Sequence, residues 1–570
     1  MYQLRYFWPK FILLQAQLNK FQFHINTIPA ALYASGLRQV VISPGSRNAP
    51  LIMAFARFNK IKCLSVLDER SAAFVALGIA KQTARPCAAI CTSGSALANF
   101  YPAVLEAHYM QVPLLIISAD RPPEMIDRWD GQTIHQYNLF HPHIKASFQY
   151  PLFDGIDQSD AVLDICNDFY KSAIIGVNGP VHLNVPMDEP LYEAVSETFE
   201  YPVISESRSV IAEKHESQTL DSKHLEILNQ SGKILYLTGT QNLSDDELLH
   251  LNELNLKIPV LADITSNNRV FNEFNHWEIA LNSVDESYWQ RLKPDVLISS
   301  GKMLLNKKLK QLLRQSPPKL HVHLDPNGYC ADTFFSHPVV VKTTPRDFFS
   351  RIHLDHLQSE YFDNWMALCT RRSDKEQTFN FNVWSELTAI YYILKNLKNQ
   401  ILHLSNSMTV RNVAYLAQYL SHSVKVYCNR GVSGIDGCSS TAVGMALADS
   451  NNQHVLITGD LAFLYDINVF LMNERPSNLK IIVMNNNGGG IFRLIDGPSK
   501  MRELDPFMIT PHNKNIGDIA QAYDIPFSSV DTLEGLKDEL KDFFENPGMQ
   551  LLEIKTNQII NNQIFNQFKQ

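Results

Sequence analysis

Two runs in the last third of the chain end in side chains suited to binding a metal ion together with a phosphate group. The run HVLITGD ends at Asp460, and the run LKIIVMNNN ends at Asn487 and continues into glycines 488–490. If these runs are neighbouring parallel strands, their carboxyl ends meet at one sheet edge, where open α/β sheets bind ligands. Magnesium prefers oxygen ligands such as carboxylates and phosphates, and glycines let the backbone approach a diphosphate closely. We therefore expect Asp460 and Asn487 to hold a metal–diphosphate group.

A glutamate near the start of the chain is placed where it could carry out acid–base chemistry. Glu69 follows the run CLSVLD and opens the apolar stretch RSAAFVALGIAKQ, which predicts a helix after a strand. A carboxyl group in an apolar site can hold a shared proton, because burial favours its neutral form. The same position suits a glutamate that only complements the helix dipole. Taken alone, the residue leaves both roles open.

Several arginines also follow strand-like runs, and hydroxyl or amide side chains stand beside them. Guanidinium groups bind carboxylates through two parallel hydrogen bonds, so such a set suits a substrate that carries several carboxylates. Any one of these arginines could equally be a solvated surface charge, but their joint placement at strand ends favours binding. The cations are Arg47, Arg121, Arg411 and Arg430, and the neutral donors are Ser46, Gln132 and Ser407.

The elements that must position these residues are short β-branched runs that alternate with helical segments. Apolar runs of this length, bounded by Gly, Asn or Asp, are typical of strands buried on both faces of a parallel sheet. The pattern predicts an α/β chain with three Rossmann-like domains near 20–190, 220–355 and 380–570. Polar stretches at 189–225 and 355–383 are predicted linkers, the second with a helix. The predicted strands lie at 39–43, 63–68, 87–92, 114–119, 233–239, 259–263, 295–301, 320–325, 401–407, 425–431, 454–460, 479–487 and 550–556.

The bulk properties exclude some classes of protein. The net charge of −8 does not favour a nucleic-acid or anionic-membrane partner. The eight cysteines form no C-x-x-C pair, so we expect buried, inert thiols, with Cys87 and Cys91 on one strand face, and a reducing compartment, the cytoplasm. No run is long enough to span a membrane. Residues 1–20 lack the features of a signal peptide, and we expect an extension or a first helix there.

The pairing of Gly459-Asp460 with Asn486-Asn487 resembles the fingerprint of thiamine-diphosphate-dependent enzymes. The resemblance implies a pyrimidine-binding, a central and a diphosphate-binding domain. It implies that the Gly489 carbonyl completes the protein ligands of Mg²⁺ (or Mn²⁺), and that Glu69 drives the cofactor's aminopyrimidine into its imino form. Because the family places its cofactor between two subunits, the resemblance also implies an obligate homodimer or a tetramer with shared active sites.

A narrower resemblance is to the SEPHCHC synthases, where SEPHCHC is 2-succinyl-5-enolpyruvyl-6-hydroxy-3-cyclohexene-1-carboxylate. It rests on motifs in both end domains, chiefly SPGSRNAPL, SADRPPE, GQTIHQ, NSMTVRN and NRGVSGIDG. It implies that 2-oxoglutarate is decarboxylated and that the succinyl carbanion adds to isochorismate, on the route to menaquinone. The family pattern assigns Ser46, Arg47, Arg121 and Gln132 to isochorismate, and Ser407, Arg411 and Arg430 to the 2-oxoglutarate-derived part.

The resemblance also suggests roles for residues whose types would otherwise indicate only structure. Lys307 and Lys308 are similar to a basic pair of the family's central domain, although the second position is often arginine there. Ile435 corresponds to the aliphatic residue that bends the cofactor, and Ile491 and Phe492 to an apolar wall of the site. Ordinary core packing would account for these three apolar residues equally well.

Three alternatives remain open at the level of the sequence. The first is another thiamine-diphosphate 2-oxo-acid decarboxylase or carboligase, some of which bind FAD; residues 220–355 contain no glycine-rich dinucleotide fingerprint. The second is a non-catalytic relative, which the presence of Glu69, Asp460 and Asn487 disfavours. The third is a nucleotide-binding protein, but the sequence lacks the G-x-x-x-x-G-K-[ST] loop.

Overall fold

The computed structural model forms two compact units, and we describe each by itself. Unit 1 comprises Met1–Glu213, Gly431–Asn451 and Asp466–Pro476, and unit 2 comprises Lys214–Arg430, Asn452–Tyr465 and Ser477–Gln570. The residues that the structure describes are 4–154, 159–189, 191, 199–204, 217–241, 245–254, 256–268, 274–352, 354 and 357–570.

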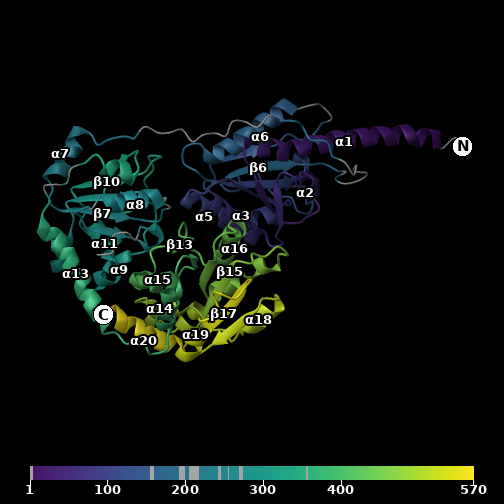
Figure 1. Cartoon of the computed structure of the whole chain (residues 1–570). Helices are drawn as coiled ribbons and strands as arrows, with labels where there is room; N and C mark the ends of the chain where they lie inside the picture. Colours follow the sequence, from purple (N-terminus) through teal and green to yellow (C-terminus); the bar gives the residue numbers. More distant parts are fainter. Residues whose placement is uncertain are drawn as a thin grey trace. The chain divides into compact units, whose positions relative to one another are not determined.

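Unit 1 contains a parallel six-stranded sheet of order β2-β1-β3-β4-β6-β5. Every residue of β3 and β4 is buried, as expected for central strands covered on both faces. Helices α1, α2 and α6 share a hydrophobic core with one face, while α3 and α5 lie on the other side in Figure 1. The strands are β1 Gln39–Ile42, β2 Lys62–Ser65, β3 Cys87–Cys91, β4 Leu114–Asp120, β5 Ala146–Gln149 and β6 Val181–Pro186; the helices are α1 Leu4–Ser35, α2 Ala49–Ala56, α3 Glu69–Thr83, α4 Ser95–Asn99, α5 Tyr101–Met110, η1 Pro123–Met125 and α6 Ser159–Ile174.

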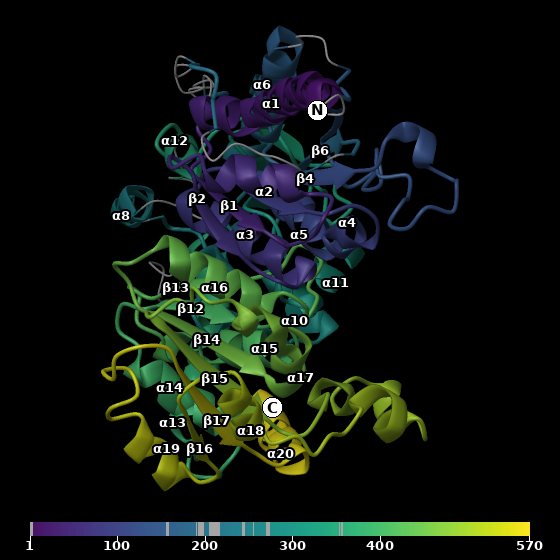
Figure 2. The same ribbon diagram turned by 90° about the vertical axis from the view of Figure 1, so that its right-hand side faces the viewer.

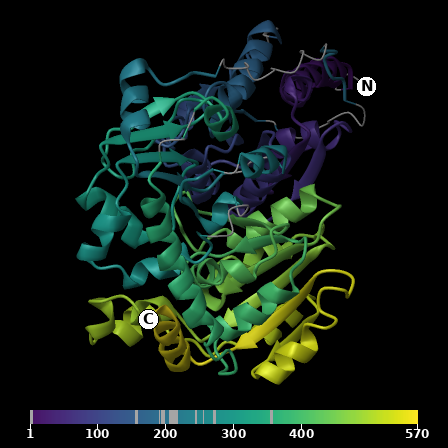
Figure 3. The same cartoon turned by 60° about the vertical axis from the view of Figure 1, so that its left-hand side comes forward.

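The central part of the chain, in unit 2, forms a parallel five-stranded sheet of order β11-β10-β9-β7-β8. Helices α7, α8 and α12 cover one face, and α9, α10, α11 and α13 cover the other, so the teal strands lie between helices in Figure 3. The strands are β7 Ile234–Thr238, β8 Val260–Ala262, β9 Val296–Ser300, β10 Leu320–Leu324 and β11 Val339–Val341; the helices are α7 Ser222–Gln230, α8 Asp245–Glu253, η2 Ile264–Ser266, α9 Trp277–Ala280, η4 Leu281–Ser283, α10 Glu286–Leu292, α11 Lys307–Gln315, α12 Pro345–Phe349 and α13 Ser359–Gln377.

The second sheet of unit 2 is also parallel and six-stranded, with the order β13-β12-β14-β15-β17-β16 that can be followed in Figure 2. Helices α14, α15, α19 and α20 share one hydrophobic core with its strands. The strands are β12 Ile401–Leu404, β13 Lys425–Cys428, β14 His454–Gly459, β15 Leu479–Asn485, β16 Phe527–Val530 and β17 Gln550–Lys555. The helices are α14 Glu386–Asn396, α15 Met408–Tyr415, η5 Ala417–Tyr419, α17 Asp460–Tyr465, η7 Gly490–Arg493, η8 Pro498–Lys500, the π-helix η9 Leu504–Ile509, α18 Ile516–Ala522, α19 Leu533–Glu539 and α20 Gln558–Lys569.

Two further helical segments belong to unit 1 although their neighbours in the chain belong to unit 2: α16 Cys438–Ala448 and η6 Ile467–Leu471. Helix α16 packs tightly along α3. A Cβ atom added to Gly78 of α3 would lie 2.3 Å from the Thr441 carbonyl oxygen, and one added to Gly444 of α16 would lie 2.1 Å from the Val75 carbonyl oxygen. The two helices therefore meet backbone to backbone, which only glycine permits at these positions.

The α/β fold class with three parallel sheets, predicted from the sequence, is confirmed. Residues 4–20 form the first part of helix α1, and the polar stretch after 355 contains α13, as expected. Much of the predicted linker at 189–225, namely residues 190, 192–198 and 205–216, lies outside the described residues. Cys87 and Cys91 are buried, and burial raises the pKa of both thiols, consistent with inert side chains. Among the described helices, none is both long and apolar enough to cross a membrane.

Candidate active site

The predicted metal residues follow two strands that the fold places side by side in unit 2. Strands β14 and β15 pair in parallel, with Gly459 opposite Met484, so their carboxyl ends reach the same sheet edge. Asp460 begins α17 directly after β14 and is 2% exposed. Its Oδ1 accepts from the Leu461 N–H at 2.7 Å, and its Oδ2 accepts from the Gly488 N–H at 2.9 Å. This carboxylate thus fixes the turn that follows the neighbouring strand.

That turn requires its unusual residues for conformational reasons. Asn487 has a φ of 63°, in the left-handed region that asparagine tolerates better than most residues, and its side chain is exposed. Gly488 has a φ of 142°, and a Cβ atom there would lie 2.6 Å from the Ile509 carbonyl oxygen. Asn485 stabilises the turn because its Oδ1 accepts from the Asn487 N–H at 3.1 Å. The asparagines and glycines are therefore needed to shape the turn as well as to offer ligands.

The donor set at this edge fits Mg²⁺ with a diphosphate. It offers the Asp460 carboxylate, the Asn487 amide and the main-chain carbonyl of Gly489, all oxygen ligands of the kind that Mg²⁺ takes alongside phosphates. Within the described ranges, no group of three or more His, Cys, Asp and Glu side chains could hold a metal ion. Because the site contributes only one carboxylate, a bound Mg²⁺ would keep positive charge with which to attract the negative diphosphate. His512 Nε2, 3.1 Å from Asp460 Oδ2, adds a further polar contact.

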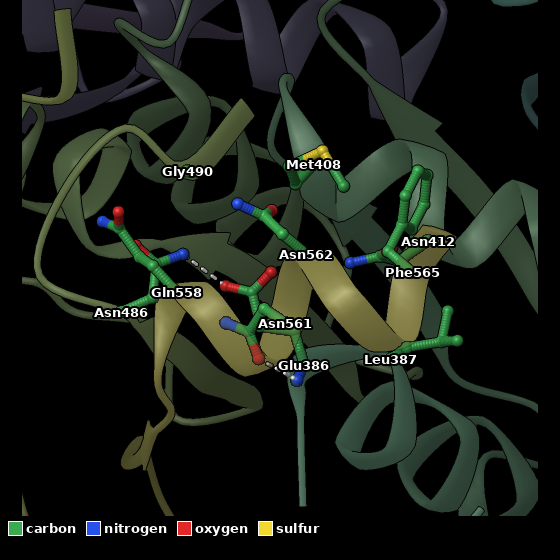
Figure 4. Close-up of a pocket in the computed structure, with 10 residues that line it drawn as sticks. All are labelled: Glu386, Leu387, Met408, Asn412, Asn486, Gly490, Gln558, Asn561, Asn562 and Phe565. Carbon is green, nitrogen blue, oxygen red and sulfur yellow. Dashed lines mark hydrogen bonds between the residues drawn. The ribbon is translucent and has the colours of Figure 1, made fainter. Parts of the chain in front are cut away.

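A buried carboxyl group supports the same turn from behind, in a small pocket shown in Figure 4. Glu386 accepts from Asn486 Nδ2 at 2.6 Å, and its own N–H donates to Asn561 Oδ1 at 2.9 Å. Gln558 Nε2 donates to Asn486 Oδ1 at 3.1 Å. Burial raises the pKa of Glu386 to about 7, although its hydrogen bond with Asn486 opposes the shift. The first residue of the Asn486–Asn487 pair is therefore held by α14 and α20.

The two apolar residues predicted to line the site follow the turn directly. Ile491 and Phe492 lie in η7 and are half-buried. The Phe492 ring packs close to the turn, since a Cβ atom on Gly489 would lie 3.2 Å from its Cδ2. Arg493, next in the chain, donates to Gln558 Oε1 at 3.1 Å. This segment is thus anchored on the same helix, α20, as Asn486.

The two arginines predicted in the last third of the chain are brought close together. Arg430 donates from Nη1 to Asn406 Oδ1 at 2.7 Å, and Arg411 donates from Nη1 to the carbonyl of Ser407. Burial lowers the pKa of Arg411, and the positive charge of Arg430 lowers it further. Ser407, with a φ of 74°, directly precedes α15. Two cations held this close favour an anionic ligand between or beside them.

A fully buried acid that the sequence did not single out lies near this pair. Burial raises the pKa of Glu278 well above its usual value, nearby Asp263 raises it further, and the charges of Arg430 and Arg411 oppose both effects. No hydrogen-bond partner among the described residues satisfies its Oε1 atom. The residue stands in α9 with no motif around it, so only the fold reveals its position.

The predicted lysine pair has a mixed placement at the start of α11. Lys307 is exposed, whereas Lys308 donates to the Val284 carbonyl at 2.6 Å and is occupied there. Lys310 instead is the lysine within electrostatic reach of Arg430: burial lowers its pKa first, and Arg430 lowers it next. Lys307 and Lys308 remain predicted substrate residues, and Lys310, in the same helix turn, is the lysine whose charge interacts with that of Arg430.

In unit 1, Glu69 is the first residue of α3, as expected, and is partly exposed. The preceding residue, Asp68, caps the helix by accepting from the Ser71 N–H at 3.1 Å and also accepts from Asn468 Nδ2 at 2.7 Å. Asp68 therefore caps the helix end, while Glu69 Oε2 accepts from Asn99 Nδ2 at 3.5 Å. Ile435, in the segment 431–451 that belongs to the same unit, is half-buried.

The predicted isochorismate residues of unit 1 gather around two arginines. Arg47 is 3% exposed and pairs with Glu189 at 3.0 Å; burial lowers its pKa, and Arg121 lowers it further. Arg121 donates to the Gly131 carbonyl at 3.1 Å. Ser46 and Gln132 are both exposed beside them. Gln132 also lies against the Gly94 loop, because a Cβ atom on that glycine would lie 3.0 Å from the Gln132 Cα.

A buried glutamine, which the sequence did not distinguish from its neighbours, ties these loops together. Gln136 is 1% exposed; its Oε1 accepts from the Gly94 N–H at 2.7 Å, and its Nε2 donates to the Ala119 carbonyl at 3.0 Å and to Asn184 Oδ1 at 2.8 Å. It thus links the loops that carry Gly94 and Arg121. Similarly, the buried carboxylate of Glu106 accepts from the Gly431 N–H at 2.9 Å and from that of the next residue.

Comparison with known proteins identifies the class that this fold and these strand-end residues define. Residues 26–139 match the N-terminal binding domain of thiamine pyrophosphate (thiamine diphosphate) enzymes, and residues 412–554 match the C-terminal binding domain. A 2-succinyl-5-enolpyruvyl-6-hydroxy-3-cyclohexene-1-carboxylate synthase of Cytophaga hutchinsonii is 38% identical over 96% of this chain and 98% of its own length. The chain belongs to the family of these SEPHCHC synthases.

Further relatives carry the same name. The synthase of Flavobacterium johnsoniae is 37% identical, covering 94% of this chain and 96% of its own length. That of Bacteroides thetaiotaomicron is 34% identical, covering 94% of this chain and 96% of the relative. The two resemblances seen in the sequence motifs, to thiamine diphosphate enzymes and to SEPHCHC synthases, are thereby confirmed.

Proposed function

We propose that the protein decarboxylates 2-oxoglutarate and adds the resulting succinyl carbanion to isochorismate, giving SEPHCHC and CO₂ on the route to menaquinone. The observation that carries the proposal is the near-full-length similarity to SEPHCHC synthases. The paired, partly buried arginines Arg411 and Arg430 support it, because each proposed substrate carries two carboxylates.

The residues present fit thiamine diphosphate and its metal. Asp460, Asn487 and the carbonyl of Gly489 would hold Mg²⁺ or Mn²⁺ and, through it, the diphosphate. When bound, the cofactor supplies the carbon nucleophile and the electron sink for decarboxylation. Glu69 would hold the proton that activates the pyrimidine ring of the cofactor, and Ile435, Ile491 and Phe492 would offer it apolar contacts.

The substrate residues act mainly by orientation, because two anionic reactants must be held in register. Ser407, Arg411 and Arg430 bind the carboxylates of 2-oxoglutarate, and Lys307 and Lys308 extend this positive surface from the central domain. The isochorismate residues are Ser46, Arg47, Arg121 and Gln132. Neutral donors beside guanidinium groups fix the orientation of each carboxylate.

The proposal extends to organisation and location. Residues 20–190 form the pyrimidine-binding domain, 220–355 the central domain and 380–570 the diphosphate- and metal-binding domain. The chain assembles as a homodimer or tetramer with shared active sites and works in the cytoplasm. The buried cysteines Cys87, Cys91 and Cys166 form no disulfide, which supports a reducing compartment.

A coupled assay with purified protein tests the proposal. The mixture contains thiamine diphosphate, Mg²⁺ and 2-oxoglutarate, with or without isochorismate, and isochorismate absorbance and product mass are followed. Loss of isochorismate that requires every component, with formation of the succinylated adduct, is expected. Decarboxylation without loss of isochorismate would show that the acceptor is wrong, and absence of cofactor binding would overturn the proposal.

A further inference from the structure

A further cavity in unit 2, whose lining includes none of the residues proposed above for the cofactor and the substrates, is lined by several positively charged side chains. Its volume is about 420 Å³, and it lies between α9–α10, α13 and the end of α20. Figure 1 marks the C-terminus of the chain beside α13 and α20. Four cationic side chains line this cavity: Arg371, Arg372, Lys375 and Lys569.

One of these cations is buried and lacks the partners that a buried guanidinium requires. Arg372 is 7% exposed, and its Nε and Nη2 atoms have no hydrogen-bond partner among the described residues. Its guanidinium lies 4.4 Å from the ring centroid of Phe568. Glu376, one turn further along α13, is a buried carboxylate that attracts it electrostatically; its Oε1 accepts from Gln418, and its Oε2 lies 3.4 Å from His276 Nε2. An unsatisfied buried charge is costly, so a cation kept in this state indicates an anionic ligand.

The negative groups of the cavity do not balance its cations. Asp285 lines the cavity but is already bonded to the N–H of Tyr288, at 2.7 Å, as the N-cap of α10. The main-chain oxygen of the last residue, Gln570, accepts from Lys375 Nζ at 3.0 Å. Positive charge therefore remains in excess beside an apolar floor formed by Ile279, Ala280 and Leu368.

The aromatic side of the cavity orients one further cation. The guanidinium of Arg371 lies 4.9 Å from the ring centroid of Tyr288 and donates to that residue's hydroxyl group. Lys308 is also nearby: burial lowers its pKa, and the charge of Lys569 lowers it further. The cavity is thus lined by two guanidinium groups, one stacked on an aromatic ring and one buried, and by two lysines. Such a set suits a compact ligand with two acidic groups.

We propose that this cavity is a binding site for a small dianion, either a dicarboxylate or a phosphate. The buried guanidinium group of Arg372 binds one acidic group of the ligand. Lys375 and Lys569 neutralise the remaining negative charge of the ligand. The site is separate from Asp460, Asn487 and the Arg411–Arg430 pair, none of which lines the cavity. Binding of the dianion in this cavity can therefore be measured without catalytic turnover.

Isothermal titration of the full chain, saturated with thiamine diphosphate and Mg²⁺, tests the site with two probes, inorganic phosphate and glutarate. We expect one of them to bind with a dissociation constant in the millimolar range or tighter. Lys569→Gln and Arg372→Gln should weaken that binding about three- to tenfold, since each removes a charged contact. Asp285→Asn should strengthen it, because the amide still caps α10 while a negative charge is lost.

The matched control is Lys541→Gln, which removes an exposed lysine that does not line the cavity. The Lys541→Gln variant should bind the probe with the same affinity as the unsubstituted protein. Binding of phosphate alone would identify a phosphate site, and binding of glutarate alone a dicarboxylate site. The proposal is wrong if neither probe binds, if Lys569→Gln and Arg372→Gln leave the affinity unchanged, or if Lys541→Gln weakens binding as much as they do.

Discussion

The carboxylate of Asp460 accepts a hydrogen bond from the main-chain N–H of Gly488 at 2.9 Å. This bond joins the end of one strand to the turn after the next, so the carboxylate shapes the turn that presents the other ligands. A single side chain thus joins the two strand ends at which we propose that the metal binds.

Asp460→Asn should reduce the affinity for thiamine diphosphate in the presence of Mg²⁺ by about 10- to 100-fold, the effect typical of altered metal ligation. The amide still fits the space, but it carries no negative charge to neutralise the metal. It also has only one oxygen, so it cannot accept from both the Leu461 and the Gly488 N–H groups. Titration of the protein with the cofactor, with and without EDTA, measures the change. Asp496→Asn, which alters an exposed carboxylate, is the control. Equal affinity in Asp460→Asn and the unsubstituted protein would exclude Asp460 as a ligand.

Glu69→Gln should retain cofactor binding and lose nearly all turnover, because the amide cannot hold the exchangeable proton. Glu534→Gln is a matched control, since Glu534 also stands in the first turn of a helix, α19, and is exposed. Steady-state rates and cofactor titrations of both variants separate the two roles left open by the sequence. Normal turnover in Glu69→Gln would leave only the helix-dipole role.

Arg411→Lys should raise the KM for 2-oxoglutarate by about tenfold or more and change that for isochorismate much less, because lysine loses the planar fork. Arg47→Lys should show the opposite selectivity. Measurement of both KM values for both variants tests the assignment of the two substrates. An equal effect on both substrates in both variants would contradict it.

Acidification should destabilise the protein partly through His182, whose side chain is fully buried in β6. Burial lowers its pKa from the usual 6.5 to about 3, so the folded protein keeps it neutral while the unfolded chain protonates. The unfolded state therefore binds more protons between about pH 6.5 and 3, and stability falls as the pH decreases through this window. At pH 5.5 the loss is about 1 kcal/mol.

Thermal unfolding of the unsubstituted protein and of His182→Gln at pH 7.5 and pH 5.5 checks this expectation. The difference in melting temperature between the two pH values should be smaller in the variant. Identical differences would mean that His182 is not responsible. The control is His337→Gln, which alters an exposed histidine and should show the same difference in melting temperature as the unsubstituted protein.

The strands that the sequence revealed are those with uninterrupted apolar runs, such as β3 and β4. It missed β6, VHLNVP, because His182 and Asn184 interrupt the pattern; both are buried, where Ser118 bonds each of them. The edge strands β5 and β16 were missed because their half-exposed residues form no apolar run, and the edge strand β11, Val339–Val341, was missed because it is only three residues long. Periodicity detects burial among apolar atoms and not burial within a polar network.

The candidate site shows the same limit. Asp460 and Asn487 could be predicted because each directly follows a strand that the sequence reveals. Glu386 and Gln136 could not, because their partners are far away in the chain and no motif surrounds them. A lysine-rich helix turn does not show which side chain lies near Arg430, so the sequence cannot distinguish Lys310 from Lys307 and Lys308.

The contact between Gly78 and Gly444 constrains how the position of α3 can change over evolutionary time. Most helix pairs are spaced by side chains, so their separation drifts as those side chains are exchanged. Here α3 and α16 touch through carbonyl oxygens, and the separation is a fixed length that no apolar substitution can adjust. The position of the helix that begins with Glu69 is therefore set by backbone contacts with α16. Side chains of the surrounding core can be exchanged without moving this helix.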